Sequence, residues 1–279
     1  MRITGAAKIA GVMGFPVKHS LSPRLHNFWL NQYQIDGCYI PMEIAPEYLP
    51  QVIKALPYTG IRGWNVTVPH KESLVSLVHR LTPMAERMGA VNTVIVEPDH
   101  TLTGTNTDAY GFIENLKQEA PSFAFKGIKV VVIGAGGASR AVCAGLLNEE
   151  VGEIVLVNRT KEKAENLKKH IGGNITVADW EKRHEILAET MLLVNTTTLG
   201  MHGFLPLDID ISLLPREALV TDIVYKPLQT ELLKMAEKKG NKTVDGLGML
   251  LYQAVPGFEM WFGKKAEVTK ELRHFILGQ

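Results

Sequence analysis

Lys71 is the residue of this chain whose type and position most directly suggest chemistry. It ends the run Asn65-Val-Thr-Val-Pro-His-Lys71, in which a short β-favouring segment precedes Pro69, a residue suited to the first position of a helix. The run predicts a lysine held at the rim of a sheet, facing whatever binds there. A surface lysine in a first helical turn is the alternative, but a cation is unfavourable beside the positive end of a helix dipole. We therefore predict a functional ammonium group that can donate a proton.

A glycine-rich turn farther along the chain has the features of a dinucleotide site. The β-favouring residues Val130 to Ile133 lead into the turn and its alanine-rich helix, with the sequence Gly134, Ala135, Gly136, Gly137, Ala138. Glycines let the backbone approach a pyrophosphate, and the helix N-terminus offers free N–H groups and a positive dipole end. Ser139 stands where the generic fingerprint has a third glycine, so a tight βα turn without a ligand is an alternative. A dinucleotide site and a positioned proton donor together suggest reduction of a carbonyl group.

The end of the next predicted strand bears on the choice of cofactor. NAD-preferring folds usually place an acidic residue there, which accepts a hydrogen bond from the ribose 2′-hydroxyl. This chain has Asn158, Arg159 and Thr160 instead, followed by Lys163. Because no acid would repel a 2′-phosphate and these side chains can bind one, we predict NADP(H) as the cofactor. A solvated charge run at a helix start is the alternative, and it fits Lys161 better than Arg159.

Composition and charge argue against several classes of protein. The net charge of +1 gives no excess of positive charge that would attract nucleic acid or an anionic membrane. No apolar run approaches the roughly 20 residues needed to span a bilayer. The apolar segment Ala6 to Phe15 is interrupted by Lys8, so we expect a first strand and not a signal peptide. Cys38 and Cys143 lack paired spacing, which predicts free buried thiols, and the histidines lack metal-ligand spacing. We expect a cytoplasmic protein without a metal site.

Short apolar segments alternate with amphipathic stretches, which is typical of βαβ units and mostly parallel sheets. The expected strands are 8–13, 38–43, 63–67, 90–97, 101–105, 129–133, 153–157, 191–195 and 219–223. The expected helices are 23–32, 46–56, 140–147, 161–170, 228–238, 247–262 and 265–276. A further helix runs to about Glu119, with Asn106 or Thr107 as its N-cap.

Taken together, these segments resemble the shikimate dehydrogenase family of the aromatic amino-acid pathway. The resemblance spans almost the whole chain, and the order and spacing of the segments are more specific than any one segment alone. They are His19-Ser-Leu-Ser-Pro23, Asn65 to Lys71, Gly89-Ala-Val-Asn-Thr93, Asn106-Thr-Asp108, Gly134 to Arg140, Asn158-Arg-Thr160 and Asp245-Gly-Leu-Gly-Met249.

We therefore expect an α/β protein with two domains. The resemblance implies an N-terminal α/β substrate domain of residues 1–104, completed by C-terminal helices in 247–279. Residues 105–246 would form a Rossmann-type, doubly wound NADP-binding domain. The active site is expected in the cleft between the domains, a common place for small-ligand pockets.

The resemblance also implies which residues hold the substrate. Ser20 and Ser22 would lend hydroxyls to its carboxylate, joined by Tyr225, although the two serines could equally cap the helix that follows. Three polar side chains would hold the ring hydroxyls: Thr67, Asn92 and Gln253. The alternative for each of these three is a structural hydrogen bond to the local backbone.

Lys71 and Asp108 would carry the chemistry and contact the substrate. Hydride transfer leaves negative charge on the carbonyl oxygen, and an ammonium group can stabilise that charge and donate the proton. Asp108 would orient the lysine, although an acid that stabilises the first turn of its helix is the alternative. The cofactor contacts assigned are Gly134, Ala135, Gly136, Gly137, Ala138, Asn158, Arg159, Thr160, Lys163, Ile223 and Gly246.

The activity implied is NADPH-dependent, reversible reduction of 3-dehydroshikimate to shikimate, a step toward chorismate. One alternative is a quinate/shikimate dehydrogenase with relaxed specificity, although family members that favour quinate tend to alter the serine pair that this chain keeps. The other is an NADPH-binding sensor without activity, which would have no need of both Lys71 and Asp108. We expect a monomer or a homodimer.

Overall fold

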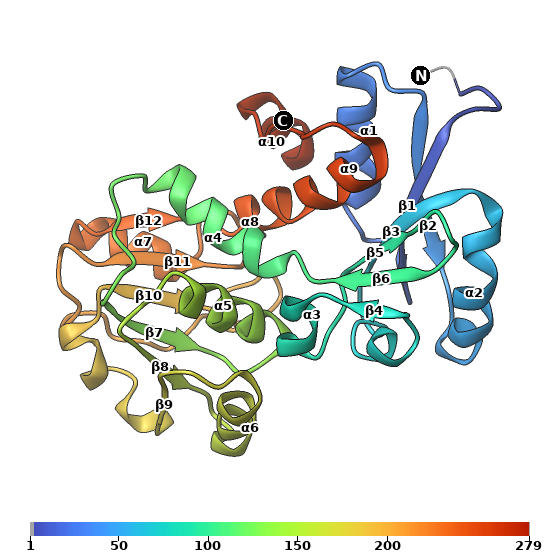
Figure 1. Cartoon of the computed structure of the whole chain (residues 1–279). Coiled ribbons are helices and arrows are strands. Elements are labelled where there is room, and N and C mark those ends of the chain that lie inside the picture. Colours follow the sequence, from blue (N-terminus) through green and yellow to red (C-terminus); the bar gives the residue numbers. More distant parts are fainter. Residues whose placement is uncertain (1–2, 279) are drawn as a thin grey trace. The chain divides into compact units, whose positions relative to one another are not determined.

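The computed structural model describes residues 3–278, which form two compact units (Figure 1). One unit contains the chain up to Thr107 and again from Leu251, and the other contains Asp108–Leu250. The sequence-based division at 104/105 and 246/247 lies a few residues earlier at each boundary. In both units strands alternate with helices, so the predicted α/β class is confirmed.

The first unit is built on a mixed sheet of six strands. Its order is β2 (Gly37–Glu43), β1 (Lys8–Gly14), β3 (Ile61–Val66), β5 (Thr93–Val96), β6 (Leu102–Thr105) and β4 (Arg80–Leu81). β1 runs parallel to β2 and β3, whereas β5 is antiparallel to β3 and β6. The predicted first strand is therefore confirmed, and the predicted strands 90–97 and 101–105 correspond to the antiparallel pair β5 and β6.

Helices from both ends of the chain complete the first unit. They are α1 (Ser22–Gln32), α2 (Leu49–Ala55), α3 (Pro83–Met88), α9 (Ala254–Phe262) and α10 (Lys270–Leu277), with 3₁₀ turns η1 (Pro46–Tyr48), η2 (Leu56–Thr59) and η3 (Ser73–Ser76). α9 packs against β1, β3 and β5, and α10 packs against α1. Trp261 fixes this docking, because it is buried and its indole N–H donates to the Val94 carbonyl at 3.0 Å.

The second unit is a doubly wound sheet of six parallel strands. Its order is β12 (Lys242–Val244), β11 (Leu219–Asp222), β10 (Leu192–Asn195), β7 (Lys129–Ile133), β8 (Glu153–Val157) and β9 (Ile175–Ala178). Its helices are α4 (Asp108–Glu119), α5 (Gly137–Asn148), α6 (Lys161–Ile171), α7 (Glu231–Lys239) and the start of α8 (Leu247–Tyr252), with η4 (Trp180–Lys182) and η5 (Glu185–Glu189). The chain proceeds from β7 to β8 and β9 on one side and then crosses to β10 on the other. The switch point of the fold therefore lies between β7 and β10.

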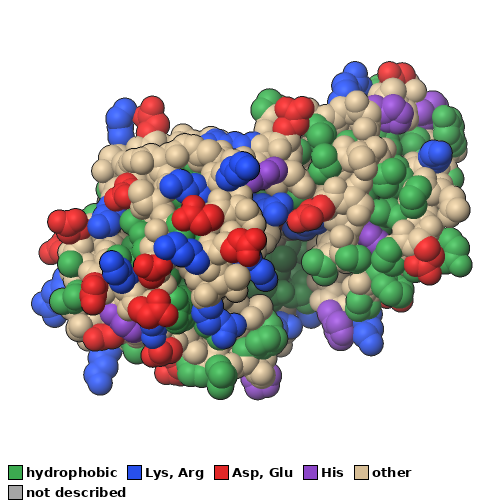
Figure 2. Space-filling model, turned by 90° about the horizontal axis from the view of Figure 1, so that it is seen from below, with side chains coloured by type: hydrophobic (Ala, Val, Ile, Leu, Met, Phe, Trp, Pro, Cys, Tyr) green, Lys and Arg blue, Asp and Glu red, His purple; other side chains and the backbone are tan. Residues whose placement is uncertain are grey.

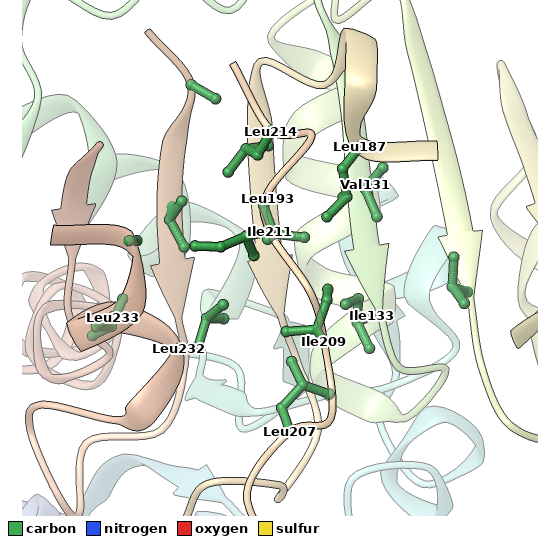
Figure 3. Close-up of a cluster of buried hydrophobic side chains, with 14 of the residues drawn as sticks. Val131, Ile133, Leu187, Leu193, Leu207, Ile209, Ile211, Leu214, Leu232 and Leu233 are labelled. Atoms are coloured by element: carbon green, nitrogen blue, oxygen red, sulfur yellow. The ribbon is translucent and has the colours of Figure 1, made fainter. Parts of the chain in front are cut away.

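One connection in the second unit contains no helix. Between β10 and β11 the buried Leu207, Ile209 and Ile211 alternate with the exposed Asp208 and Asp210. Figure 3 shows this extended segment laying its apolar side chains against the sheet residues of the same core. This extended segment, in which buried and exposed residues alternate, thus covers the sheet at a place where a crossover helix would be usual.

The predicted helices differ from the observed ones mainly at their ends. The predicted helix 46–56 is the series η1, α2 and η2, and the predicted helix 247–262 is interrupted at Gln253. The predicted helices 228–238 and 265–276 begin later, at Glu231 and Lys270. The cause is capping, because the hydroxyls of Thr230 and Thr269 accept backbone N–H bonds of the first turns.

Sequence reasoning missed three strands, each of which lies at the edge of a sheet: β4, β9 and β12. Edge strands bury less surface, so their hydrophobic pattern is weaker. Both cysteines are free, as predicted, but only Cys143 is fully buried, and burial raises the pKa of its thiol to about 12.

The surface carries charges of both signs. Figure 2 shows acidic and basic side chains interspersed on the face it draws, in keeping with the net charge of +1. Within residues 3–278, none of the helices combines the length and the apolar character that crossing a bilayer requires. The same residues contain no group of three His, Cys, Asp or Glu side chains arranged to hold a metal ion.

Candidate active site

The glycine turn lies at the switch point of the doubly wound sheet. Gly134 follows β7 with φ of +112°, and its N–H donates to the Val157 carbonyl at 2.8 Å. A Cβ at this position would lie 2.5 Å from the Thr196 hydroxyl, which follows β10. Both the backbone conformation and the lack of space therefore require glycine here.

The next glycines leave room for a ligand. A Cβ added to Gly136 or Gly137 would have no heavy atom within 4 Å, and both residues are exposed at the start of α5. A helix N-terminus with open space beside its first residues fits a pyrophosphate. The turn therefore has the geometry of a dinucleotide cradle.

Ser139 has a specific role at the third-glycine position. It is fully buried, and its hydroxyl accepts the Gly136 N–H at 3.1 Å and contacts the Thr196 hydroxyl at 2.6 Å. Because Thr196 itself donates to the Ile133 carbonyl at 2.7 Å, Ser139 donates to Thr196. The serine thus ties the glycine turn to the loop after β10. Sequence reasoning missed Thr196, whose only signal is its position directly after a buried strand.

The loop after β8 exposes two cations. Arg159 and Lys163 are exposed, and within residues 3–278 their side chains have no hydrogen-bond or ion-pair partner. In contrast, Lys161 pairs with Asp179 at 2.7 Å. Asn158 braces the turn, because its amide donates to the Thr160 carbonyl at 2.8 Å. Lys161 is therefore part of a surface ion pair, whereas Arg159 and Lys163 are available to an anion.

Asp222, at the end of β11, is a buried carboxylate that the sequence analysis did not single out. It accepts from the Asn195 amide at 3.0 Å, the Val224 N–H at 3.0 Å and the Thr230 hydroxyl at 2.8 Å. Burial raises its pKa to about 6, and these hydrogen bonds only partly oppose that effect. Asp222 therefore links the loops after β10 and β11 to the start of α7. The adjacent Ile223 is in close contact with Gly246, where an added Cβ would collide with the Ile223 backbone.

The pH dependence of stability should reveal the Asp222 carboxyl. Its folded pKa lies above the ordinary value of 3.8, so its stabilising contribution is largest below about pH 4 and is lost as the pH rises to about 6. Relative to Asp222→Asn, the wild type should lose on the order of 2–3 kcal/mol of unfolding free energy between pH 4 and pH 7. Urea unfolding at both pH values measures this change.

Asp210→Asn is the control for that measurement. Hydrogen bonds from Ser212 lower the pKa of Asp210, so its ionisation lies below the interval tested. The Asp210→Asn profile should therefore run parallel to that of the wild type. A parallel profile for Asp222→Asn as well would contradict the raised pKa.

The serine pair lies at the start of α1. Ser22 is its first residue and is buried, while Ser20 is half-buried in the preceding turn. The N-cap is Leu21, without a side-chain bond, so neither serine occupies the predicted capping position. The Ser20 hydroxyl nevertheless accepts the Ser22 N–H at 3.3 Å, which holds the Ser20 side chain against the backbone of Ser22.

The segment of Lys71 differs from the sequence prediction, because no helix begins at Pro69. Residues 68–72 form turns that lead into η3. The Lys71 carbonyl accepts the Val91 N–H at 2.8 Å and His70 is buried with its ring bonded to the Ile44 carbonyl, so tertiary contacts replace helical bonds. The predicted unfavourable helix dipole therefore does not act on Lys71, which is half-buried beyond the end of β3.

Asn92 is hydrogen-bonded to Thr107, the last residue of this segment of the first unit. Its amide oxygen accepts the Thr107 N–H at 2.9 Å, and its amide nitrogen donates to the Thr107 hydroxyl at 3.1 Å. Asp108 follows directly as the first residue of α4 and is half-buried. Asn92 thus fixes Thr107, the residue that precedes Asp108.

The predicted site residues are divided between the two units. The first unit contains Ser20, Ser22, Thr67, Lys71, Asn92 and Gln253. The second contains Asp108, Tyr225 and all the predicted cofactor residues. Tyr225 follows β11, and burial raises the pKa of its phenol. Each group lies at the ends of strands or at helix termini of its own unit.

A doubly wound unit with a glycine cradle at its switch point, in one chain with a second α/β unit, is typical of dinucleotide-binding enzymes. Family models named shikimate dehydrogenase substrate binding domain, shikimate/quinate 5-dehydrogenase and shikimate 5′-dehydrogenase C-terminal domain match residues 12–94, 114–202 and 246–270. The chain is 56% identical to shikimate dehydrogenase (NADP(+)) of Paramagnetospirillum magneticum, over 99% of this chain and 100% of that one. The chain belongs to the shikimate dehydrogenase family.

Solved structures agree with this assignment. Shikimate 5-dehydrogenase of Thermus thermophilus in complex with NADP(H) and shikimate is 36% identical, with a TM-score of 0.82 and 97% of each chain covered. Quinate dehydrogenase of Corynebacterium glutamicum in complex with NAD is 28% identical, with a TM-score of 0.90 over 98% of this chain and 99% of that one. The predicted fold class, with a Rossmann-type second unit, is confirmed.

Proposed function

We propose that this chain catalyses the reversible, NADPH-dependent reduction of 3-dehydroshikimate to shikimate, with Lys71 and Asp108 as its acid–base pair. The observation that carries the proposal is the 56% identity to a curated NADP-dependent shikimate dehydrogenase along the full chain. The units supply complementary parts, a dinucleotide cradle in one and a set of hydroxyl, amide and ammonium groups in the other.

The choice of NADP is supported by the loop after β8. No acidic residue occupies its start, and the exposed Arg159 and Lys163 can pair with a 2′-phosphate. Gly134 to Ala138 would hold the pyrophosphate at the N-terminus of α5, with Ile223 and Gly246 lining the strand ends beyond it. When bound, the cofactor supplies the hydride.

Lys71 would supply the proton. As negative charge develops on the substrate carbonyl oxygen, the ammonium group stabilises it and donates a proton to that oxygen. Asp108 would hold the ammonium group in position and accept a hydrogen bond from a neighbouring substrate hydroxyl. In the reverse direction the neutral amine would take the hydroxyl proton.

The remaining site residues would position the ring. Ser20, Ser22 and Tyr225 are hydroxyl donors suited to a carboxylate, and they bind an anion without adding a permanent charge. Thr67, Asn92 and Gln253 would bond the ring hydroxyls. We further propose a cytoplasmic enzyme, monomeric or homodimeric, which size-exclusion chromatography with light scattering would establish.

An initial-rate assay tests the function directly. The purified chain should reduce NADP with shikimate and give much lower kcat/KM with quinate, because the serine pair is retained. NAD should be the poorer cofactor, by roughly ten- to hundredfold if the 2′-phosphate makes charge-assisted bonds. Binding of NADPH without turnover of either substrate would support the sensor alternative instead.

A further inference from the structure

Two buried hydroxyl groups, those of Ser139 and Thr196, support the glycine turn of the second unit. Their oxygens lie 2.6 Å apart, and the two residues are 0% and 7% exposed. Thr196 donates to the carbonyl of Ile133 at 2.7 Å, and Ser139 accepts the N–H of Gly136 at 3.1 Å. The pair therefore forms one path of hydrogen bonds from the end of β7, where the turn begins, to the residue before α5.

The loop that carries Thr196 is itself held in place. The amide oxygen of Asn195 accepts the Thr197 N–H at 3.0 Å, and its amide nitrogen donates to the Asp222 carboxylate at 3.0 Å. The same loop also packs against the start of the turn. A Cβ added to Gly134 would lie 2.5 Å from the Thr196 hydroxyl and 2.9 Å from the Thr197 methyl group. Thr196 thus supports the turn from a fixed position.

The turn needs such support because it consists mainly of glycine. Three of the four residues 134–137 are glycines, and glycine loses more conformational freedom on ordering than any other residue. If a ligand had to order the turn, that loss would weaken its binding. Hydrogen bonds that order the turn in advance remove this cost from the binding step.

We propose that Thr196 is a positioning residue for cofactor binding, which acts through the Ser139 hydroxyl to hold the glycine turn in the shape that receives the pyrophosphate. This inference rests on the proposed function, because Gly134 to Ala138 are its pyrophosphate contacts. NADP and NAD share the pyrophosphate, whereas only NADP carries the 2′-phosphate assigned to Arg159. Loss of the hydroxyl pair should therefore weaken both cofactors by the same factor, unlike loss of the arginine.

Thr196→Val tests the role of the hydroxyl, because it removes that group and preserves the shape of the side chain. We expect the Kd values of NADPH and NADH, measured by fluorescence titration, to rise roughly tenfold each. The Kd of adenosine 2′-monophosphate, measured by displacement of NADPH, should stay within twofold, because this ligand has the 2′-phosphate and no pyrophosphate. Thr196→Ser keeps the hydroxyl and should stay within twofold of the wild type for all three ligands.

Thr190→Val is the matched control. Thr190 precedes β10, is fully buried and donates to the Ile186 carbonyl at 2.9 Å. Its substitution therefore removes a comparable buried hydroxyl at the opposite end of the same strand. All three Kd values should remain those of the wild type.

Ser139→Ala breaks the same path from the side of α5 and tests the inference independently of the threonine. It should raise the Kd values of NADPH and NADH roughly tenfold. The double variant with Thr196→Val should bind NADPH less than threefold more weakly than the weaker single variant, because both substitutions remove the same support.

The inference would be overturned by a wild-type Kd for NADPH in Thr196→Val or in Ser139→Ala. An equal rise for adenosine 2′-monophosphate, or a Thr196→Ser variant as weak as Thr196→Val, would also overturn it. Wild-type protein that binds NADPH without turnover of shikimate would instead refute the proposed function, and the binding constants would still decide the role of Thr196.

Discussion

Replacing Lys71 with alanine is expected to lower kcat by roughly 10²–10⁴-fold, with only a modest change in KM for shikimate. The ammonium group interacts most strongly with the transition state, where the carbonyl oxygen carries negative charge, so its loss acts on turnover more than on binding. Initial rates in both directions at saturating NADP(H) measure the effect.

Two controls distinguish chemistry from folding in that experiment. Lys54→Ala removes an exposed lysine of α2, outside the proposed site, and should leave kcat unchanged. A small primary amine added to the Lys71→Ala variant should restore part of the turnover, since it can occupy the vacated space and donate a proton. Wild-type turnover in Lys71→Ala would remove the lysine from the mechanism.

Arg159→Gln is expected to lower kcat/KM for NADP by roughly ten- to hundredfold and to leave kcat/KM for NAD nearly unchanged. A charge-assisted bond to the 2′-phosphate contributes roughly 1.5–3 kcal/mol, and NAD has no such group. The preference for NADP over NAD should therefore shrink by the same factor. Parallel initial-rate measurements with the two cofactors give this ratio.

Lys161→Gln is the matched control, because it removes a neighbouring cation that is already paired with Asp179. It should leave the ratio of the two cofactors unchanged. If Arg159→Gln lowered kcat/KM equally for both cofactors, the arginine would support the loop after β8 and would not bind the 2′-phosphate.

The interior strands of both sheets were predictable from sequence, because their hydrophobic patterns report burial directly. The predicted strands 129–133 and 153–157 have the same bounds as β7 and β8 in the structure. The edge strands β4, β9 and β12 were missed, since an edge strand is short and partly polar. Helix starts were shifted where a threonine cap, and not the first apolar residue, sets the first turn.

The candidate site was predictable to the extent that its residues belong to local motifs. The glycine turn and the cations after β8 could be assigned a role because a strand–turn–helix pattern implies their geometry. Asp222 belongs to no such motif, and one of its partners, Asn195, lies 27 residues away in the chain. The helix predicted at Pro69 was wrong for the same reason, because the Lys71 carbonyl bonds to Val91.

The sequence by itself determined the fold class, the glycine cradle and the absence of an acid after β8, since each depends on neighbours in the chain. Only the tertiary structure decided that Ser139 and Thr196 close the glycine turn, and that Asn65 connects Tyr39 with Thr93. Those decisions depend on hydrogen bonds between buried groups that are distant in sequence. Such bonds exist only once the sheets have brought their strands together.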